Sequence, residues 1–318
     1  MTAYDPQLEP YVSQLPAVDL SNVVAAREEM ERIRQSFGAA PELRDVGWTD
    51  HIVGGDDDDS DTVRVRVYEP DRRADEPTPA VLFLHGGGFV MGSVESEHLA
   101  AGVLAVAIGV VVVSVDYRLA PEHPYPAAIE DAYRSLQWIH DRHLSLGVDP
   151  ARVAVVGNSA GGGLAAALAI LARDRQGPPI CAQLLGTPEL DDRLLSHSSV
   201  EFIDTPLWSR PAAEHSWRYY LGELHRCEAV PITAAPGRAT AEDLTGLPPA
   251  YVSSMQNDPL RDEAVAYALE LMNAGIIVEL HSFPGTFHGS AQVRSRVSKR
   301  QHREQVAWLR QILDLSTD

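Results

Sequence analysis

One serine of this sequence lies in a turn bounded by glycines and could act as a nucleophile. Ser159 lies in the stretch VAVVGNSAGGGLAAAL (153–168), where four apolar residues run directly into Gly-Asn-Ser-Ala-Gly and an alanine-rich segment follows. The pentapeptide fits G-x-S-x-G, in which a strained turn between strand and helix holds the serine hydroxyl above the edge of a sheet. Flanking glycines let strand and helix pass closely, and the helix N-terminus favours negative charge developing at the serine. The order of apolar strand, turn and helix therefore predicts Ser159 as a nucleophile.

Two residues far along the chain could activate this hydroxyl. A serine attacks poorly unless a base removes its proton, and that base needs a carboxylate to orient it. Asp258 follows the predicted strand AYVSS, and His288 follows the predicted strand VELHSF. Both lie just past the carboxyl ends of strands, where sheets of this class place their sites, and the chain order is that of α/β hydrolases. Asp262, expected inside the next helix, is the alternative carboxylate, and we prefer Asp258.

The stretch FLHGGGFVMGS could stabilise an oxyanion. A predicted strand, Ala80–Leu84, ends at His85, and three glycines follow. Successive glycines leave bare backbone N–H groups that can point at negative charge, where side chains would obstruct the approach. A flexible loop and a phosphate cradle are the alternatives, but the helix start and the lysine of a nucleotide-binding loop are absent, which disfavours the phosphate cradle.

Short apolar strands alternate with helical stretches over most of the chain. Beyond Ala80–Leu84, strands are predicted at Val110–Val115, Val153–Val156, Cys181–Leu185, Ala250–Ser253 and Val278–Phe283. This pattern predicts an α/β fold whose mostly parallel sheet is covered by helices on both faces. Thr62–Tyr68 alternates strictly and is predicted to be a half-exposed edge strand. One helix is predicted from Pro126 to Gly147, and its apolar face consists of Ile129, Tyr133, Leu136 and Ile139.

The charge of the chain excludes some classes of partner. With 45 acidic and 26 basic residues the net charge is −19, which repels nucleic acid and anionic lipid, so neither partner is expected. The apolar run Leu99–Val115 is divided by Gly109 and is too short for a membrane span. It is predicted to be a buried helix that ends near Ile108, followed by a strand. The run Asp56–Asp59 lacks the spaced ligands of a calcium loop and is predicted to be a solvated hairpin tip.

The cysteines and the N-terminus favour a cytoplasmic protein. Cys181 and Cys227 are too few for a disulfide scaffold and are expected to be free thiols in a reducing compartment. The start MTAYDPQLEPYV has no basic residue and no apolar core, so no secretory signal is expected. No Cys/His cluster has the spacing of metal ligands, so we expect neither a metal nor a cofactor.

Residues from about 187 to 240 break the alternation of strands and helices. They are rich in proline and predict no buried strand, so we expect an insertion over the sheet. Five aromatic residues cluster there: Phe202, Trp208, Trp217, Tyr219 and Tyr220. Packing against the core could explain each ring alone, but together they predict a walled substrate pocket, in which we also place Phe89 and Phe287. Such a pocket predicts small acyl groups, acetyl to butyryl, on a bulky alcohol.

Several blocks together resemble a known enzyme family. HGGG, DYRLAPEHPYP, GNSAGGGLA, DPLRDE and FHGS occur in the order and spacing of the bacterial hormone-sensitive-lipase-like esterases. PELDDR, DTPLW and LHSFPGTFHGS further resemble the subgroup that contains the bacterial heroin esterase, an acetylesterase. The resemblance covers nearly the whole chain. It implies a single α/β-hydrolase domain over residues 1–318, with a helical cap formed by about 1–40 and 187–240.

The resemblance also implies a role for each matching residue. It implies a catalytic triad of Ser159, Asp258 and His288 and an oxyanion hole formed by the N–H groups of Gly87, Gly88 and Ala160. His85 resembles the family histidine that braces the glycine loop, and Gly86 belongs to the same support. The family usually carries aspartate where this chain has Asn158, which can accept the same local hydrogen bonds without a charge. We predict that Asn158 stabilises the turn.

The leading hypothesis is a serine carboxylesterase that acts on small-molecule esters through an acyl-enzyme. A lactone hydrolase or an aryl-amidase could use the same residues, because the triad does not report the leaving group. The fold also serves as a non-catalytic small-molecule receptor in plants, where the resemblance implies that the catalytic histidine is lost; His288 is present here. Relatives suggest a homodimer, although no apolar edge pattern in this sequence proves one.

Overall fold

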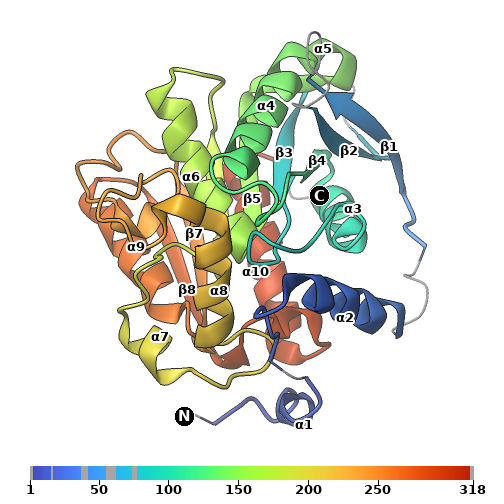
Figure 1. Cartoon of the computed structure of the whole chain (residues 1–318). Coiled ribbons are helices and arrows are strands. Elements are labelled where there is room, and N and C mark those ends of the chain that lie inside the picture. Colours follow the sequence, from blue (N-terminus) through green and yellow to red (C-terminus); the bar gives the residue numbers. More distant parts are fainter. Residues whose placement is uncertain (1–2, 16, 37–41, 55–61, 74–76, 316–318) are drawn as a thin grey trace.

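An eight-stranded sheet forms the centre of the computed structural model, with helices on both of its faces (Figure 1). The structure describes residues 3–315 except 16, 37–41, 55–61 and 74–76. The strand order is β1-β2-β4-β3-β5-β6-β7-β8; β2 is antiparallel to β1 and β4, and every other pair is parallel. The strands are β1 Val46–Val53, β2 Val63–Pro70, β3 Thr78–Leu84, β4 Val111–Asp116, β5 Val148–Asn158, β6 Ala182–Gly186, β7 Ala250–Asn257 and β8 Val278–Phe287. The predicted α/β fold with a mostly parallel sheet is confirmed.

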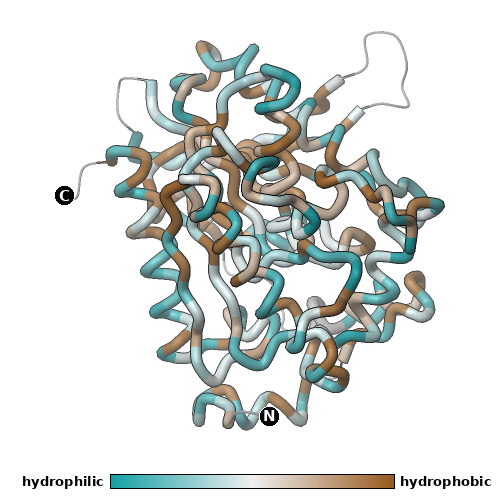
Figure 2. Tube along the Cα trace, turned by 90° about the vertical axis from the view of Figure 1, so that its left-hand side faces the viewer, coloured by the Kyte–Doolittle hydropathy of each residue, from teal (hydrophilic) through white to brown (hydrophobic). Residues whose placement is uncertain are grey.

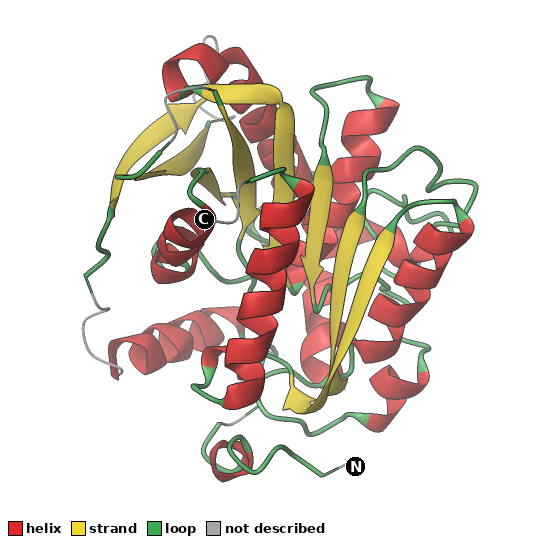
Figure 3. Cartoon of the chain, turned by 180° about the vertical axis from the view of Figure 1, so that it is seen from behind, coloured by secondary structure: helices red, strands yellow, loops and turns green. Residues whose placement is uncertain are grey.

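Two layers of helices bury the two faces of this sheet. One layer consists of α3 (His98–Ile108) and α10 (Arg296–Ile312), seen from behind in Figure 3. The other includes α4 (Ala127–Asp141), α6 (Ala160–Asp174) and α9 (Arg261–Asn273). Figure 2 shows brown hydrophobic and teal hydrophilic segments alternating along the outer helices, as expected when one side of each helix is buried.

The apolar segments fold largely as their patterns predict. The helix predicted to end near Ile108 ends there, because Gly109 adopts a left-handed φ of 74° and closes α3. The four residues predicted for the apolar face of the next helix, Ile129, Tyr133, Leu136 and Ile139, are all buried in α4. The prediction of one helix up to Gly147 is wrong in detail. The N–H of Arg142 closes α4 onto the carbonyls of Trp138 and His140, and a separate short helix, α5 (His143–Leu146), follows.

The prediction of a half-exposed edge strand at Thr62–Tyr68 is wrong. The corresponding strand, β2, lies inside the sheet between β1 and β4. Its alternate arginine Arg66 is only 6% exposed, because Asp50 of β1 accepts two hydrogen bonds from the guanidinium, of 2.6 and 2.8 Å, and Trp48 lies under it. The alternation of apolar and charged residues in β2 therefore reflects buried ion pairs and not exposure to solvent. The strand at this edge of the sheet is β1, which is mostly exposed and has no apolar periodicity.

The N-terminal segment and the insertion lie together beside one end of the sheet (Figure 1). They carry the helices α1 (Glu9–Val12), α2 (Val23–Ser36), α7 (His197–Glu201) and α8 (Arg210–Leu221), with short 3₁₀ turns at Gly222–Leu224 and Pro236–Arg238. Ala17 pairs with Leu207 in an isolated bridge that joins the two segments. Of the residues that the structure describes before position 40, those in α1 and α2 are helical. The predicted hairpin tip at Asp56–Asp59 lies outside the described residues. No helix within the described residues is long and apolar enough to cross a membrane.

Candidate active site

Ser159 occupies the predicted turn between a buried strand and a buried helix. β5 ends at Asn158 and α6 begins at Ala160. The serine between them has φ 56° and ψ −124°, a strained conformation for a residue with a side chain. A Cβ at Gly157 would overlap the carbonyl of Gly161, and a Cβ at Gly161 would overlap the carbonyl of Leu84, so both glycines permit the close crossing. The turn presents the hydroxyl at the carboxyl edge of the sheet.

The tertiary fold brings His288 and Asp258 to this serine. Ser159 Oγ lies 2.9 Å from His288 Nε2, and His288 Nδ1 lies 2.8 Å from Asp258 Oδ2. All three side chains are buried, and Asp258 is completely so. Its second oxygen, Oδ1, accepts the backbone N–H of Leu260 at 2.9 Å, which fixes the carboxylate. With Nδ1–H donated to Asp258, Nε2 of the imidazole is free to accept the serine proton.

Asp262, the alternative carboxylate, faces a different part of the molecule. Its oxygens accept the backbone N–H of Ser198 and Nε–H of Arg261, each at 2.7 Å. The Ser198 hydroxyl in turn accepts the N–H of Asp262 and donates to the carbonyl of Pro259. Asp262 therefore anchors the start of α7 onto α9, while Asp258 contacts His288.

The glycine loop after β3 turns with backbone angles that only glycine adopts easily. Gly87 and Gly88 have φ of 123° and 59°. A Cβ at Gly87 would overlap the backbone of Met91, and one at Gly88 would overlap the Trp208 ring. No hydrogen bond among the described residues uses the N–H of either glycine, and the N–H of Ala160 is among the first of α6, which have no acceptor within the helix. All three donors remain available to an oxyanion.

His85 lies beneath this loop as a buried structural group. Its Nδ1–H donates to the carbonyl of Gly86 at 2.8 Å, and its ring stacks on Tyr117 with centroids 4.0 Å apart. The Tyr117 hydroxyl donates to the His85 carbonyl at 2.7 Å. Burial lowers the pKa of His85 to about 4, so the imidazole is neutral at pH 7. This geometry suits a residue that braces the loop.

Asn158 does not make the side-chain hydrogen bonds predicted for it. Within the described part of the chain its amide has no hydrogen-bond partner. Its Oδ1 lies instead over Gly186 of the neighbouring strand β6, where a Cβ would overlap it. Backbone hydrogen bonds hold the turn. The Ser159 N–H donates to the carbonyl of Gly186 at 2.8 Å, and the Gly163 N–H donates to the carbonyl of Ser159 at 3.0 Å.

Of the seven aromatic residues predicted for the substrate pocket, Trp208 alone has a ring contact with the triad in the described structure, with its ring centroid 5.8 Å from that of His288. Phe89 stacks on Tyr220, Phe202 lies against the Arg261 guanidinium, and Phe287 meets Tyr4. Trp217 and Tyr220 are also buried. These rings pack the insertion and the N-terminal segment onto the core, because burying them removes large apolar areas from water.

Sequence reasoning missed Glu189, which directly adjoins the nucleophile. Its backbone N–H donates to the Ser159 carbonyl at 3.0 Å. Its carboxyl group is fully buried, and neither oxygen has a hydrogen-bond partner among the described residues. Burial raises the pKa of Glu189 to about 8, so the acid is mainly neutral at pH 7. Its place just after β6, at the same edge of the sheet as Asp258 and His288, was the available signal.

A metal site is not evident at this edge or elsewhere in the described residues, where no group of three or more His, Cys, Asp or Glu side chains could hold an ion. Cys181 and Cys227 are both free thiols, as predicted. The groups assembled at Ser159 are thus a hydroxyl, an imidazole, a carboxylate and backbone N–H donors.

Comparison with known proteins identifies the family. The chain matches the α/β-hydrolase fold family over residues 81–292. Carboxylesterase NlhH of Mycobacterium tuberculosis is 39% identical over 289 residues, covering 90% of this chain and 88% of that protein. Esterase LipI of the same bacterium is 43% identical over 251 residues, which cover 78% of this chain and 75% of that protein. A solved structure of the bacterial heroin esterase has a TM-score of 0.93 and 45% identity over 98% of each chain. The chain therefore belongs to the α/β-hydrolase fold family, among its hormone-sensitive-lipase-like carboxylesterases.

Proposed function

We propose that the chain hydrolyses esters of short acyl groups, acetyl to butyryl, through an acyl-enzyme formed on Ser159. The observation that carries the proposal is the continuous hydrogen-bond path from Ser159 Oγ to His288 (2.9 Å) and on to Asp258 (2.8 Å). A nucleophile, its base and the base's orienting group in this relation are what acyl transfer requires.

The reaction proceeds in two halves. Ser159 Oγ attacks the ester carbonyl carbon while His288 Nε2 takes its proton, and Asp258 stabilises the imidazolium. The oxyanion accepts hydrogen bonds from the N–H groups of Gly87, Gly88 and Ala160. His288 then gives the proton to the departing alcohol, which leaves the acyl group on Ser159. Water, deprotonated by His288, attacks this acyl-enzyme, and the acid and free serine are released.

The position of Trp208 supports the short-acyl preference. Its indole extends from the insertion onto the glycine loop, against Gly88 and near His288, so a rigid ring narrows the space beside the reacting carbonyl. Ser216 of α8 holds the same loop by donating to the Gly88 carbonyl at 2.9 Å. The structurally similar bacterial heroin esterase acts, by its name, on heroin.

Hydrolysis of p-nitrophenyl esters tests the proposal directly. The parent protein should cleave acetate and butyrate esters much faster than the dodecanoate, and Ser159→Ala and His288→Ala should each lower kcat by about 10³-fold or more. Mass spectrometry of quenched His288→Ala after slow acylation should find one acetyl group on the peptide containing Ser159. Near-normal turnover by either folded variant would reject the triad, and faster cleavage of the dodecanoate would reject the small pocket. Activity is expected to survive dialysis against a chelator.

We also propose that the N-terminal segment and residues 187–240 form one cap over the site. Val18 N–H donates to the Leu207 carbonyl at 2.9 Å, and Arg27 donates to the carbonyls of Val90 and Ala120, at 2.7 and 2.9 Å, beside the glycine loop. Removal of residues 1–38 is expected to lower activity and solubility together; a fully active truncated protein would contradict the cap.

A cytoplasmic location and a homodimer remain predictions. Two free thiols, Cys181 and Cys227, support a reducing compartment. Cell fractionation tests the location, and light scattering of the purified protein tests the dimer. Recovery in an extracellular fraction would contradict the first, and a monomer mass would contradict the second.

A further inference from the structure

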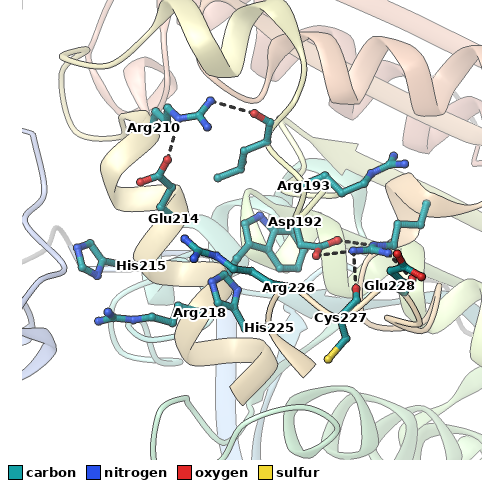
Figure 4. Close-up of a pocket in the computed structure, with 13 residues that line it drawn as sticks. Asp192, Arg193, Arg210, Glu214, His215, Arg218, His225, Arg226, Cys227 and Glu228 are labelled. Atoms are coloured by element: carbon teal, nitrogen blue, oxygen red, sulfur yellow. Dashed lines mark hydrogen bonds and ion pairs between the residues drawn. The ribbon is translucent and has the colours of Figure 1, made fainter. Parts of the chain in front are cut away.

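A cavity of about 560 Å³ lies in the insertion and is lined mainly by charged side chains (Figure 4). Its walls are α8, residues 192–194 and residues 225–228, together with Arg238. None of the triad residues lines it. We propose that this cavity binds a small polyvalent anion that carries carboxylate or phosphate groups.

Two of the three acidic side chains in the lining are neutralised within the protein. Asp192 accepts two hydrogen bonds from Arg238, of 2.6 and 2.9 Å, and Glu214 accepts one of 2.8 Å from Arg210 (Figure 4). Glu228 is the third acidic residue, and it is exposed. These ion pairs build the walls and leave their carboxylates little net charge to repel an incoming anion.

The remaining basic residues have donors to offer. Arg226 has no side-chain hydrogen bond or ion pair within the described part of the chain, and it is held in a left-handed backbone conformation with φ 64°. Arg218 contacts Tyr219, through a hydrogen bond of 3.1 Å and by lying over its ring. Nδ1 of His225 and Nδ1 of His215 are buried and lack a hydrogen-bond partner among the described residues. Figure 4 shows Arg218, His225 and Arg226 close together at one side of the cavity.

Two arginines lie close enough to His225 to affect its pKa, and Asp192 opposes them. Burial and then the adjacent Arg226 lower the pKa of His225, and Arg218 adds to the effect. Two guanidinium groups that face one space favour oxyanions with two or more charges, because each planar guanidinium can donate two parallel hydrogen bonds to a carboxylate or a phosphate. A chain of net charge −19 would otherwise repel such a ligand, so the local concentration of arginine is the feature that selects it.

Titration calorimetry of the full-length protein with pyrophosphate and with citrate as probes tests the site. The parent should show saturable binding of at least one probe, and Arg218→Gln/Arg226→Gln should bind it about tenfold or more weakly, since the double variant removes charge-assisted hydrogen bonds from both guanidinium groups. The matched control is Arg294→Gln/Arg303→Gln, which removes the same charge from exposed residues outside the cavity and should bind as the parent does. The two probes distinguish phosphate from carboxylate preference.

Circular dichroism is the check on folding, and hydrolysis of p-nitrophenyl acetate should also be unchanged because none of these arginines contacts the triad. If the double variant loses this activity, the exposed single variant Arg226→Gln replaces it and should weaken binding by at least threefold. The proposal is overturned if neither probe binds saturably, or if the control pair weakens binding as much as the cavity pair. Failure of the esterase assignment would leave these binding results unchanged, so the two proposals are tested separately.

Discussion

The indole ring of Trp208 lies beside the imidazole of His288, with ring centroids 5.8 Å apart and the planes inclined by 35°. The same indole packs on Gly88, so closely that a Cβ there would overlap it. One side chain of the insertion thus contacts both the base and the glycine loop. Acyl specificity and loop geometry are therefore expected to depend on this one ring.

Replacement of Trp208 by alanine should widen the acyl side of the pocket. We expect the ratio of kcat/KM for octanoate to that for acetate p-nitrophenyl esters to rise about tenfold, because a hydrophobic pocket discriminates by roughly this amount for a small change in chain length. Trp308→Ala is the control, since Trp308 is buried in the cluster under α3 and α10, which contains none of the triad residues. It should lower stability and leave the ratio unchanged. An unchanged ratio in Trp208→Ala would remove this residue from the pocket.

Asp258→Asn should lower kcat by about 10⁴-fold, because the amide favours the wrong tautomer of His288. Asp262→Asn should retain most of the activity, since its carboxylate binds Ser198 and Arg261 instead. Kinetics of both variants on p-nitrophenyl acetate, with circular dichroism to confirm folding, decides between the two carboxylates. Greater damage from the change at position 262 would reverse our assignment.

Gly88→Ala should impair catalysis more than folding. The new methyl group would overlap Trp208 and displace an oxyanion donor, which costs about 10²-fold or more in kcat. Gly109→Ala is a matched control, because Gly109 also has a left-handed φ, of 74°, but nothing lies within 4 Å of the added methyl. That variant should lose about 1 kcal/mol of stability and keep its kcat. Equal kcat in both variants would contradict a role for the glycine loop.

Glu189→Gln should change how stability depends on pH. Burial raises the pKa of Glu189 from 4.5 to about 8, so the folded parent holds a proton that the unfolded chain has released. The parent therefore loses stability as pH rises from 4.5 to 8, while glutamine contributes no such loss. The unfolding free energy of the variant relative to the parent should increase with pH over this window, by at most about 1.4 kcal/mol per unit. Urea titrations at several pH values measure this, with exposed Glu242→Gln as control. A difference that does not vary with pH would show that Glu189 is ionised in the folded protein.

Structural features that depend only on residues close together in the sequence were predictable from it. Gly157 and Gly161 around Ser159, the apolar runs of the parallel strands and the break at Gly109 each act through local sterics or local burial, so their consequences follow from a short stretch of chain. The order of Ser159, Asp258 and His288 past three strand ends predicted one site edge for the same reason. Sheet topology places those ends together whichever loops connect them.

Contacts between distant segments were decided by the tertiary structure alone. The hydrogen bond between Ser159 and His288 spans 129 residues, and only packing sets its 2.9 Å length. Side chains from other elements determine three further features: the lack of a hydrogen-bond partner for the Glu189 carboxyl group, the position of Trp208 and the burial of Arg66. The residue pattern within one strand does not predict such distant partners. Alternation in β2 predicted an exposed edge because the pattern shows which residues are polar, whereas burial also depends on whether Asp50 of another strand pairs with them.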